Sequence, residues 1–324
     1  MKPQFSITSN GSDITSQIAD RLLSLTVRDE AGTKSDTCSV VLSDKGQNLQ
    51  LPNDGTELEV KLGYETLVSL GKYKTDEVRF AFPPATITIR AKAMPDTFKT
   101  QKTRSWDDKI IADIVSEIAA EHNLNHRIAS EFATIEIEHM DQTEESDAHF
   151  LTRLAKEHGA ISKPAGGTLL FIPTGEGKTA SGKALSVIEI NVDEATAYSC
   201  TQKQRGKYEK IIAKYNDKET GTEKTVEHML NSTSEDSAVK RIKTIFPTEA
   251  EALEAAKAEG IELQAGQIDV NVTIVGRPDI FAESPVKLIG FRSDPMDTNW
   301  TIRSVTHQFN SGGYITKIAC DNSD

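Results

Sequence analysis

The stretch that decides the fold runs from Lys99 to Pro173. It opens with KTQKTRSWDDKIIADIVSEIAAEHNL and closes with SDAHFLTRLAKEHGAISKPAGGTLLFIP. Apolar residues recur in both halves at the spacing of amphipathic helices, and the second half ends in a hairpin pattern. The sequence therefore predicts an α+β region here, with β-rich sequence on either side of it.

The first predicted helix begins at Ser105. Ser105 is a good N-cap, Asp108 gives a short-armed capping box, and Asp107 adds the negative charge that the helix dipole favours in the first turn. The apolar residues of one face are Ile110, Ile111, Ile114, Val115 and Ile118. The pattern stops near His122 and Asn123. We expect the apolar face to pack on a sheet while the polar face stays in water.

The second predicted helix begins at Ser146 or Asp147. It ends before Gly159, which fits the left-handed position just past a helix end. A β-hairpin follows, in which residues 160–163 pair with residues 168–172. Between the two helices, Ile135 and Ile137 predict a short strand. The side chains expected to be buried are Ile111, Ile114, Ile118, Phe150, Leu151 and Leu154.

Alternating apolar residues fill the flanking parts of the chain. Residues 1–98 contain about six or seven short strands at the spacing of a barrel or sandwich. Residues 186–324 are β-rich again, with a helical insert over 248–260 that starts with a capping box at Thr248. Residues 216–240 are polar and charged, and we expect a long excursion or loop there. We find no repeat at a fixed period between the two flanks.

The predicted fold class is α+β and β-rich, with two β-barrel-type domains that flank a smaller α+β domain. A chain of 324 residues suits two or three domains. We expect a first β-barrel over residues 1–98, a middle domain over 99–185, and a second β-barrel over 186–324.

The composition limits the classes of function. The net charge of −12 argues against general nucleic-acid binding, which needs basic patches to displace counterions. Cys38, Cys200 and Cys320 are far apart and in no metal-ligand spacing, as in a chain that folds in a reducing cytoplasm. Cys38 and Cys320 lie in alternating strand patterns, so we expect them in the core. The N-terminus has no apolar signal core, and no stretch approaches the roughly 18 apolar residues of a membrane span.

One segment matches a phosphate-binding loop only at its end. Residues 175–179 read GEGKT. A phosphate-binding loop needs a glycine five places before the glycine of Gly-Lys-Thr, and that place holds Ile172. The preceding pattern is also a hairpin rather than a parallel strand, so we do not expect nucleotide binding.

The remaining polar residues do not form a recognisable active site. His122 and His126 have the i,i+4 spacing of two metal ligands, but no further ligand surrounds them, and we interpret them as exposed helix-end residues. His149 and His158 do not form a pair. The chain has no serine nucleophile elbow, while paired-acid glycan hydrolysis stays open on sequence alone. We therefore predict no enzyme activity, and no catalytic, cofactor-binding or metal-binding residues.

Several of these stretches carry a family resemblance. The run ESDAHFLTRLAKEHGAISKPAGGTLLFIP resembles a segment of the phage late control protein D family, the baseplate hub proteins of P2-like and Mu-like contractile tails. That family is similar to the hub-like N-terminal part of the type VI secretion spike. The likeness continues in LGKYKTDEVRFAFPPATITIRAKA, TRSWDDKIIADIV, VTIVGRPDIFAESPVKLIGF and WTIRSVTHQFNSGGYITKIAC, and so covers nearly the whole chain.

The resemblance implies a structural hub that assembles as a homotrimer. Each subunit would supply two barrels to a ring of pseudo-sixfold symmetry, which joins the sixfold tail tube to the trimeric spike and contacts other baseplate proteins. The implied location is the virion tail baseplate, assembled in the host bacterial cytoplasm. We expect acidic residues along the channel, no tight DNA binding and no membrane anchor. The isolated chain can stay monomeric until a partner binds.

Two other classes of function stay open. A DNA-binding late-gene regulator is disfavoured by the acidic charge and by the lack of a basic recognition helix. A peptidoglycan-binding or -cleaving module would suit the size of the middle domain. A glycan groove is usually lined with aromatic residues, however, and this region has only Trp106, Phe132, Phe150 and Phe171. The sequence does not separate a phage tail from a phage-derived bacteriocin, and it does not identify the strands of a trimer interface.

Overall fold

The structure is a computed structural model. The residues that it describes are 2–32, 34–46, 49–94, 96–165, 167–173, 187–202, 208–217, 221–230, 238–265, 268–292, 296 and 299–322. The chain divides into two compact units. The first comprises Met1–Tyr198, Asn271–Phe291 and Thr301–Cys320, and the second comprises Ser199–Val270, Arg292–Trp300 and Asp321–Asp324.

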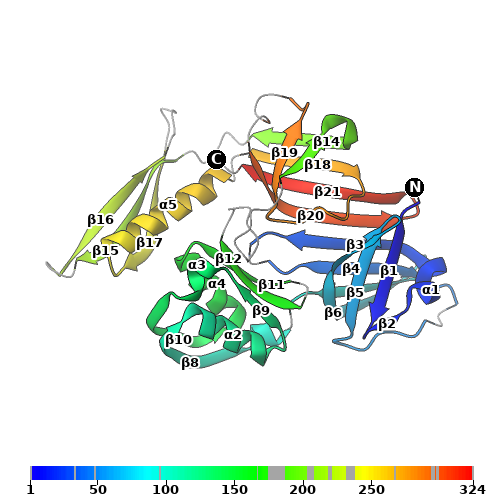
Figure 1. The fold of residues 1–324 in the computed structure, drawn as a ribbon, viewed down its shortest axis with the longest axis horizontal. Helices are drawn as coiled ribbons and strands as arrows, with labels where there is room; N and C mark the ends of the chain where they lie inside the picture. The colour runs from blue at the N-terminus through cyan, green and yellow to red at the C-terminus, as the bar shows by residue number, and fades with distance from the viewer. Residues whose placement is uncertain are drawn as a thin grey trace. The chain divides into compact units, whose positions relative to one another are not determined.

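A sheet of 13 strands combines strands from the N-terminal and the C-terminal parts of the chain (Figure 1). Its N-terminal strands are β1 (Gln4–Ser9), β2 (Ser12–Asp13), β3 (Leu22–Glu30), β4 (Thr37–Ser43), β5 (Glu57–Gly63), β6 (Leu67–Ala81) and β7 (Thr86–Lys92). Its C-terminal strands are β13 (Ile188–Asn191), β14 (Ala195–Gln202), β18 (Ile268–Val275), β19 (Pro285–Ile289), β20 (Trp300–Asn310) and β21 (Gly313–Asn322). The short helices α1 (Thr15–Ile18) and η1 (Ala19–Arg21) precede β3, and η3 (Val192–Glu194) precedes β14.

The N-terminal and C-terminal strands follow the same plan. Their spatial order is β3-β4-β7-β6-β5-β1 in the first strand group and β14-β18-β21-β20-β19-β13 in the second strand group. Corresponding strands also come in the same order along the chain. One pairing differs, because β1 runs antiparallel to β5 whereas β13 runs parallel to β19. The shared plan defines pairs of equivalent strands, such as β6 with β20 and β3 with β14.

The two strand groups join edge to edge. Strands β3 and β20 pair antiparallel, from Glu30 opposite Ser304 to Ser24 opposite Asn310. Figure 1 shows β18, β21, β20 and β3 side by side as part of one layer. The strands of the first group bury every second residue, because successive side chains of a strand point to opposite faces. Its core includes Ile7, Leu25, Val27, Cys38, Val40, Leu42, Leu58, Val60 and Leu62.

The expected positions of the cysteines are confirmed. Cys38 and Cys320 are buried free thiols in β4 and β21. Cys200, in β14, is partly exposed. The α+β, β-rich fold class is also confirmed. The division into domains at residues 98 and 185 stays a prediction.

The middle region combines helices with two small sheets. Its elements are η2 (Asp96–Lys99), β8 (Gln101–Ile110), α2 (Ile111–Glu121), β9 (Asn125–Ile128), α3 (Ser130–Ala133), β10 (Glu136–Ser146), α4 (Asp147–Glu157), β11 (Ala160–Ala165) and β12 (Thr168–Pro173). Strands β8 and β10 form one sheet, and β11-β12-β9 form the other. The six residues predicted to be buried all lie in one core: Ile111, Ile114, Ile118, Phe150, Leu151 and Leu154.

The predicted start of the first helix is wrong. Residues from Ser105 to Ile110 belong to β8, whose Trp106 lies opposite Met140 of β10. Asp108 has a φ of 49°, and the Ser105 hydroxyl donates to Asp141 instead of capping a helix. Pairing with β10 keeps this segment in a strand, so α2 begins only at Ile111.

The second helix and the hairpin are confirmed. Ser146 is the N-cap of α4, and its hydroxyl accepts a hydrogen bond from the backbone N–H of His149. Gly159 has a φ of 66°, as the left-handed position requires. Strands β11 and β12 pair from Ala160 opposite Pro173 to Ala165 opposite Thr168.

The second unit contains a small sheet covered by a helix. Its strands are β15 (Tyr208–Asp217), β16 (Thr222–Met229) and β17 (Ala238–Phe246), in the order β16-β15-β17, and its helix is α5 (Glu249–Ala265). The core consists of Ile211, Ala213, Ala252 and Ala256. In the chain the strands β15 to β17 and helix α5 lie between β14 and β18, at the place where β3 and β4 of the first strand group follow one another directly.

Two predictions for this unit are wrong. The expected loop over residues 216–240 contains β16, whose Glu227 and Glu223 pair with Lys210 and Lys214 of β15. Because most of its residues are polar, this strand shows little hydrophobic alternation. The helix also continues past Gly260, where an added Cβ would lie 2.9 Å from Leu230. Gly260 therefore permits close packing of the helix rather than ending it.

Candidate functional site

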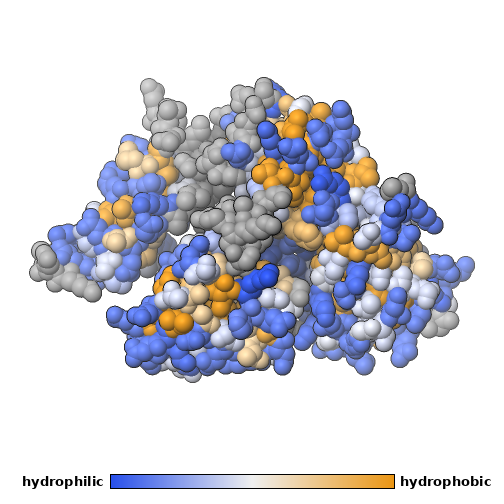
Figure 2. Space-filling view, viewed as in Figure 1, coloured by the Kyte–Doolittle hydropathy of each residue, from blue (hydrophilic) through white to orange (hydrophobic). Residues whose placement is uncertain are grey.

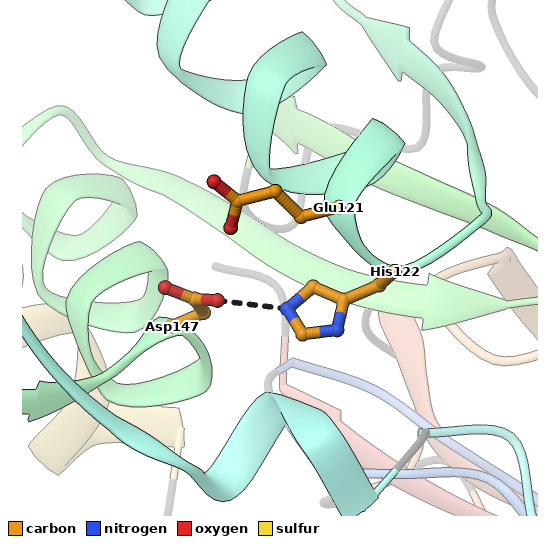
Figure 3. Close-up of side chains that lie close together, drawn as sticks. All are labelled: Glu121, His122 and Asp147. Carbon is orange, nitrogen blue, oxygen red and sulfur yellow. Dashed lines mark hydrogen bonds and ion pairs between the residues drawn. The ribbon is translucent and has the colours of Figure 1, made fainter.

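A buried carboxylate lies in the middle region. Asp147, the first residue of α4, has no exposed surface. Its Oδ1 accepts hydrogen bonds from Arg104 Nη2 and Gln142 Nε2, both at 2.8 Å. Its Oδ2 accepts from Lys102 Nζ at 2.5 Å and lies 2.7 Å from His122 Nε2. Figure 3 shows the carboxylate of Asp147 and the ring of His122 pointing toward one another.

Glu121 binds the same two cations. Its carboxylate accepts hydrogen bonds from Arg104 Nη1 and Lys102 Nζ, both at 2.6 Å. Burial tends to raise the pKa of Asp147, but the hydrogen bonds from Gln142, Lys102 and its other partners outweigh burial and hold that pKa below its usual value. The cluster is therefore a charge-balanced network that stabilises the ionised form of Asp147.

Three side chains of this cluster have the arrangement of a candidate metal site. Glu121, His122 and Asp147 each place one possible ligand atom within 4.8 Å of the others, and they are the one such group in the described part of the chain. Lys102 and Arg104 already supply the positive charge, and both oxygens of Asp147 already have two polar partners. A metal ion would have to displace these donors, so the donor set fits a structural ion network better than a metal centre.

The same cluster contains a hydrogen-bonded chain of hydroxyl, imidazole and carboxylate. Thr97 Oγ1 lies 2.8 Å from His122 Nδ1, and His122 Nε2 lies 2.7 Å from Asp147. This order resembles a nucleophile, base and acid triad. In a triad the carboxylate stabilises the protonated histidine, but here Lys102 and Arg104 already balance its charge. The geometry therefore favours a structural role for His122.

The interpretation of His122 as an exposed helix-end residue is wrong. It is 6% exposed, and its ring stacks on Phe98 at 3.9 Å. His126 is exposed, as predicted, but it lies in strand β9 rather than at a helix end. His122 and Asp147 are 25 residues apart, and no spacing rule in the sequence connects them. Residues 175–179, considered above as a phosphate-binding loop, lie outside the described residues.

A second buried ion cluster connects the β11–β12 hairpin to the first strand group. Lys163 Nζ lies 3.1 Å from Asp29 Oδ1 and 3.2 Å from Asp36 Oδ1. It also donates to the backbone oxygen of Glu30. Asp29 Oδ2 accepts from the backbone N–H of Ala282 at 2.8 Å, so the segment after β18 meets the cluster too. We call Lys163, Asp29 and Asp36 the Lys163 cluster.

The Lys163 cluster places two carboxylates beside one ammonium. Burial raises the pKa of Asp36 to about 7, although the nearby Lys163 ammonium acts in the opposite direction. Burial would lower the pKa of Lys163, but Asp29 and Asp36 outweigh it and raise that pKa. Lys163 thus links β11 to Asp29, Glu30 and Asp36, and Asp29 in turn binds the segment after β18.

Two strand edges carry exposed aromatic side chains. Strand β6 pairs with β5 over residues 67–74 and with β7 over residues 74–81, and within the described chain no other strand lies along that second half. Phe80 and Phe82, at the tip of the β6–β7 hairpin, are 59% and 81% exposed. Strand β14 pairs with β18 alone in the described part of the sheet, and its Tyr198 is 49% exposed. Figure 2 shows hydrophobic residues on the visible face around β14, β18 and β19.

The chain is similar in sequence to known phage proteins. A family model described as the phage tail baseplate hub (GPD) matches residues 68–313. The probable baseplate hub protein of Escherichia phage 186 is 31% identical, and the match covers 98% of this chain and 92% of that protein. The chain belongs to the phage tail baseplate hub family. The probable baseplate hub protein of Escherichia phage P2 is also 31% identical, over the same shares of the two chains.

Solved structures share the hub fold at low sequence identity. A 43 kDa tail protein of prophage MuSo2 from Shewanella oneidensis has a TM-score of 0.75 at 13% identity, with 99% of this chain and 98% of that chain covered. A tail protein of Neisseria meningitidis has a TM-score of 0.74 at 10% identity, with 99% and 97% covered. A type VI secretion component of E. coli has a TM-score of 0.57 at 11% identity, with 99% and 77% covered. These likenesses show a common fold for the hub family and tail proteins.

One further finding concerns membranes. Of the helices that the structure describes, none combines the length and the apolar content needed to span a bilayer.

Proposed function

We propose that this chain is the structural hub of a contractile-tail baseplate and acts as a homotrimeric symmetry adaptor. The ring of three chains joins a sixfold tail tube on one face to a trimeric spike on the other. The observation that carries this proposal is the shared plan of the two strand groups in a member of the baseplate hub family. Three chains with two equivalent groups each give six similar units around a true threefold axis.

The names of related proteins support the proposed partners. The E. coli type VI component is described as structurally similar to tail proteins of bacteriophage T4. A protein complex of PdpA and VgrG from Francisella contains a chain with a TM-score of 0.58 to this one, at 8% identity. By analogy, the partners of this hub are a trimeric spike, the tail tube or its initiator, and other baseplate proteins. The proposed location is the virion tail baseplate, with assembly in the host cytoplasm.

The proposed role needs no chemical step. The network around Asp147 is charge-balanced, and its His122 is buried. We further propose that acidic residues line the ring channel, since a like-charged wall does not retain the phosphate backbone of passing DNA. The net charge of −12 supports this reading. A gel shift at physiological salt should accordingly show no low-micromolar DNA binding.

The test of the adaptor role is the solution mass of the full chain, measured alone and with the cognate spike. We expect three hub copies in the complex with the spike, whether the isolated chain is a monomer or a trimer. A complex with one or six hub copies would refute the adaptor role. Peptidoglycan cleavage by the wild type that is lost in Thr97→Val would instead show that Thr97, His122 and Asp147 act as a catalytic triad.

A further inference from the structure

The two strand groups can be aligned residue by residue at one point. The backbone N–H of Thr75 in β6 donates to Thr56, and the backbone N–H of Ile302 in β20 donates to Ser284, both at 3.0 Å. The residues before Thr56 and Ser284 each return a hydrogen bond to Thr75 and Ile302, respectively. These two residues, Gly55 and Glu283, also share a positive φ, of 73° and 65°. Thr75 and Ile302 therefore occupy equivalent positions.

Counting onward from this point matches the two hairpins. Val78 corresponds to Val305, Phe80 to His307, and Phe82 to Phe309. In the second strand group, Val305 and His307 are 0% and 1% exposed, in the part of β20 that pairs with β3. In the first strand group, Phe80 and Phe82 are 59% and 81% exposed. The position shared by His307 and Phe80 is thus buried where a neighbouring strand is present and exposed where none is described.

The chain itself contains a strand that could pair with the free edge of β6. The second half of β20 pairs with β3. The strand of the second group that is equivalent to β3 is β14. Strand β14 has a free edge in the described sheet, and its aromatic Tyr198 is half-exposed, packed edge-on against Phe291 at 5.0 Å. Each chain therefore has two free strand edges in the described sheet, namely β14 and the second half of β6. They lie at opposite ends of the row β14-β18-β21-β20-β3-β4-β7-β6.

We propose that β14 of one copy pairs antiparallel with residues 77–82 of the next copy, and so repeats between chains the β3–β20 junction found within the chain. The partner is a second copy of this chain, and the proposal rests on the trimeric hub proposed above. The contact joins two different surfaces, so it is head-to-tail and forms a ring only if the rotation between copies closes. It pairs both free edges, which would otherwise allow uncontrolled association. It also covers the exposed aromatic residues of both strands.

The first test replaces an aromatic residue on the free edge. Phe80→Asp places a charge where the next copy's β14 should lie, while the fold of the single chain is preserved because Phe80 is exposed there. We expect hub self-association with the spike present to weaken by at least about 30-fold. Met229→Asp is the matched control, since Met229 is 60% exposed on β16. It should leave the assembly unchanged, and equal loss in both variants would contradict the proposed edge.

The second test uses the native Cys200 of β14. Cys38 and Cys320 are buried, so oxidation should act on Cys200 and one introduced cysteine. In the complex of full-length hub and spike, Val78→Cys or Phe80→Cys should give disulfide-linked hub chains. Arg79→Cys is the matched control and should not, because Arg79 points to the opposite face of the strand.

The outcomes separate this inference from the proposed function. If wild-type hub forms a trimer with the spike, Phe80→Asp leaves it intact, and no cross-link forms at position 78 or 80, the β14–β6 contact is refuted while the hub role stands. A wild-type complex without three hub copies refutes the hub role and this contact together. A cross-link that forms equally at position 79 would also contradict strand pairing, which requires alternation.

Discussion

The β6–β7 hairpin and the β20–β21 hairpin occupy equivalent places in the two strand groups. They differ in whether another strand of the chain pairs with the outer edge of the hairpin. His307 of β20 is 1% exposed, because β3 of the same chain pairs with that strand. Phe80 of β6 is 59% exposed, because no strand of the described chain pairs there. The difference shows that exposure depends on the neighbouring strand rather than on the hairpin itself. An aromatic residue that is exposed at a position buried in the equivalent group indicates a neighbour from another chain.

The largest expected effect comes from placing a charge in the covered hairpin. Val305→Asp should lower the free energy of unfolding by several kcal/mol, because an unpaired carboxylate would lie in a fully buried position. Phe80→Asp should change it by about 1 kcal/mol or less in the single chain, because Phe80 faces water. Urea denaturation of both variants under monomeric conditions measures this difference. Equal destabilisation by the two substitutions would show that Val305 and Phe80 do not differ in burial within one chain.

The core of the middle region provides a reference for the effect of a mutation on unfolding free energy where no other chain is involved. Leu154 is fully buried between α4 and its neighbours, so Leu154→Ala should cost about 2–5 kcal/mol through lost burial and a cavity. The loss should be the same whether the hub is alone or assembled, since this core is closed within the chain. Thermal or chemical unfolding of the isolated hub measures it. A cost below about 1 kcal/mol would contradict the packing described for α4.

A smaller, pH-dependent effect is expected at the Lys163 cluster, beside the covered junction. Burial raises the pKa of Asp36 to about 7, so protonated Asp36 stabilises the fold at acidic pH and this contribution is lost as the pH rises to about 7. Asp36→Asn keeps a neutral side chain at every pH. From pH 7.5 to pH 5.5, the wild type should therefore gain about 2 kcal/mol of unfolding free energy relative to Asp36→Asn. Parallel denaturation curves at the two pH values would contradict the assignment.

The sequence predicted most of the regular structure where one side of an element is apolar. The stripe of α4, its Ser146 cap and Gly159 all carry local signals, and the structure confirms them. The start of α2 was mispredicted because Ser105 and Asp108 form a plausible cap, whereas pairing with the distant β10 decides their conformation. Strand β16 was missed because most of its residues are polar, and its pairing with β15 decides its conformation. Tertiary partners, which local patterns do not show, decided both cases.

The sites were harder to predict than the elements. The ion network around Asp147 joins residues from η2, β8, α2, β10 and α4, and no spacing rule connects them. The sequence pattern shows no repeat between the two flanks, so the family resemblance alone implied two related barrels. Their equivalence lies in strand order and leaves only isolated matches such as Val78 with Val305. A signal for it exists in the hairpins, where Val78 and Phe82 have the same spacing as Val305 and Phe309.

The most direct test of the central claim is a structure of the assembled baseplate that contains this hub. We expect three copies in one ring, with β14 of each copy paired antiparallel to β6 of the next and with Phe80 buried at that contact. The two junctions, within and between chains, should superpose. Six copies of the chain in the ring, or β6 edges that remain exposed in the assembly, would contradict the symmetry-adaptor role and the β14–β6 contact.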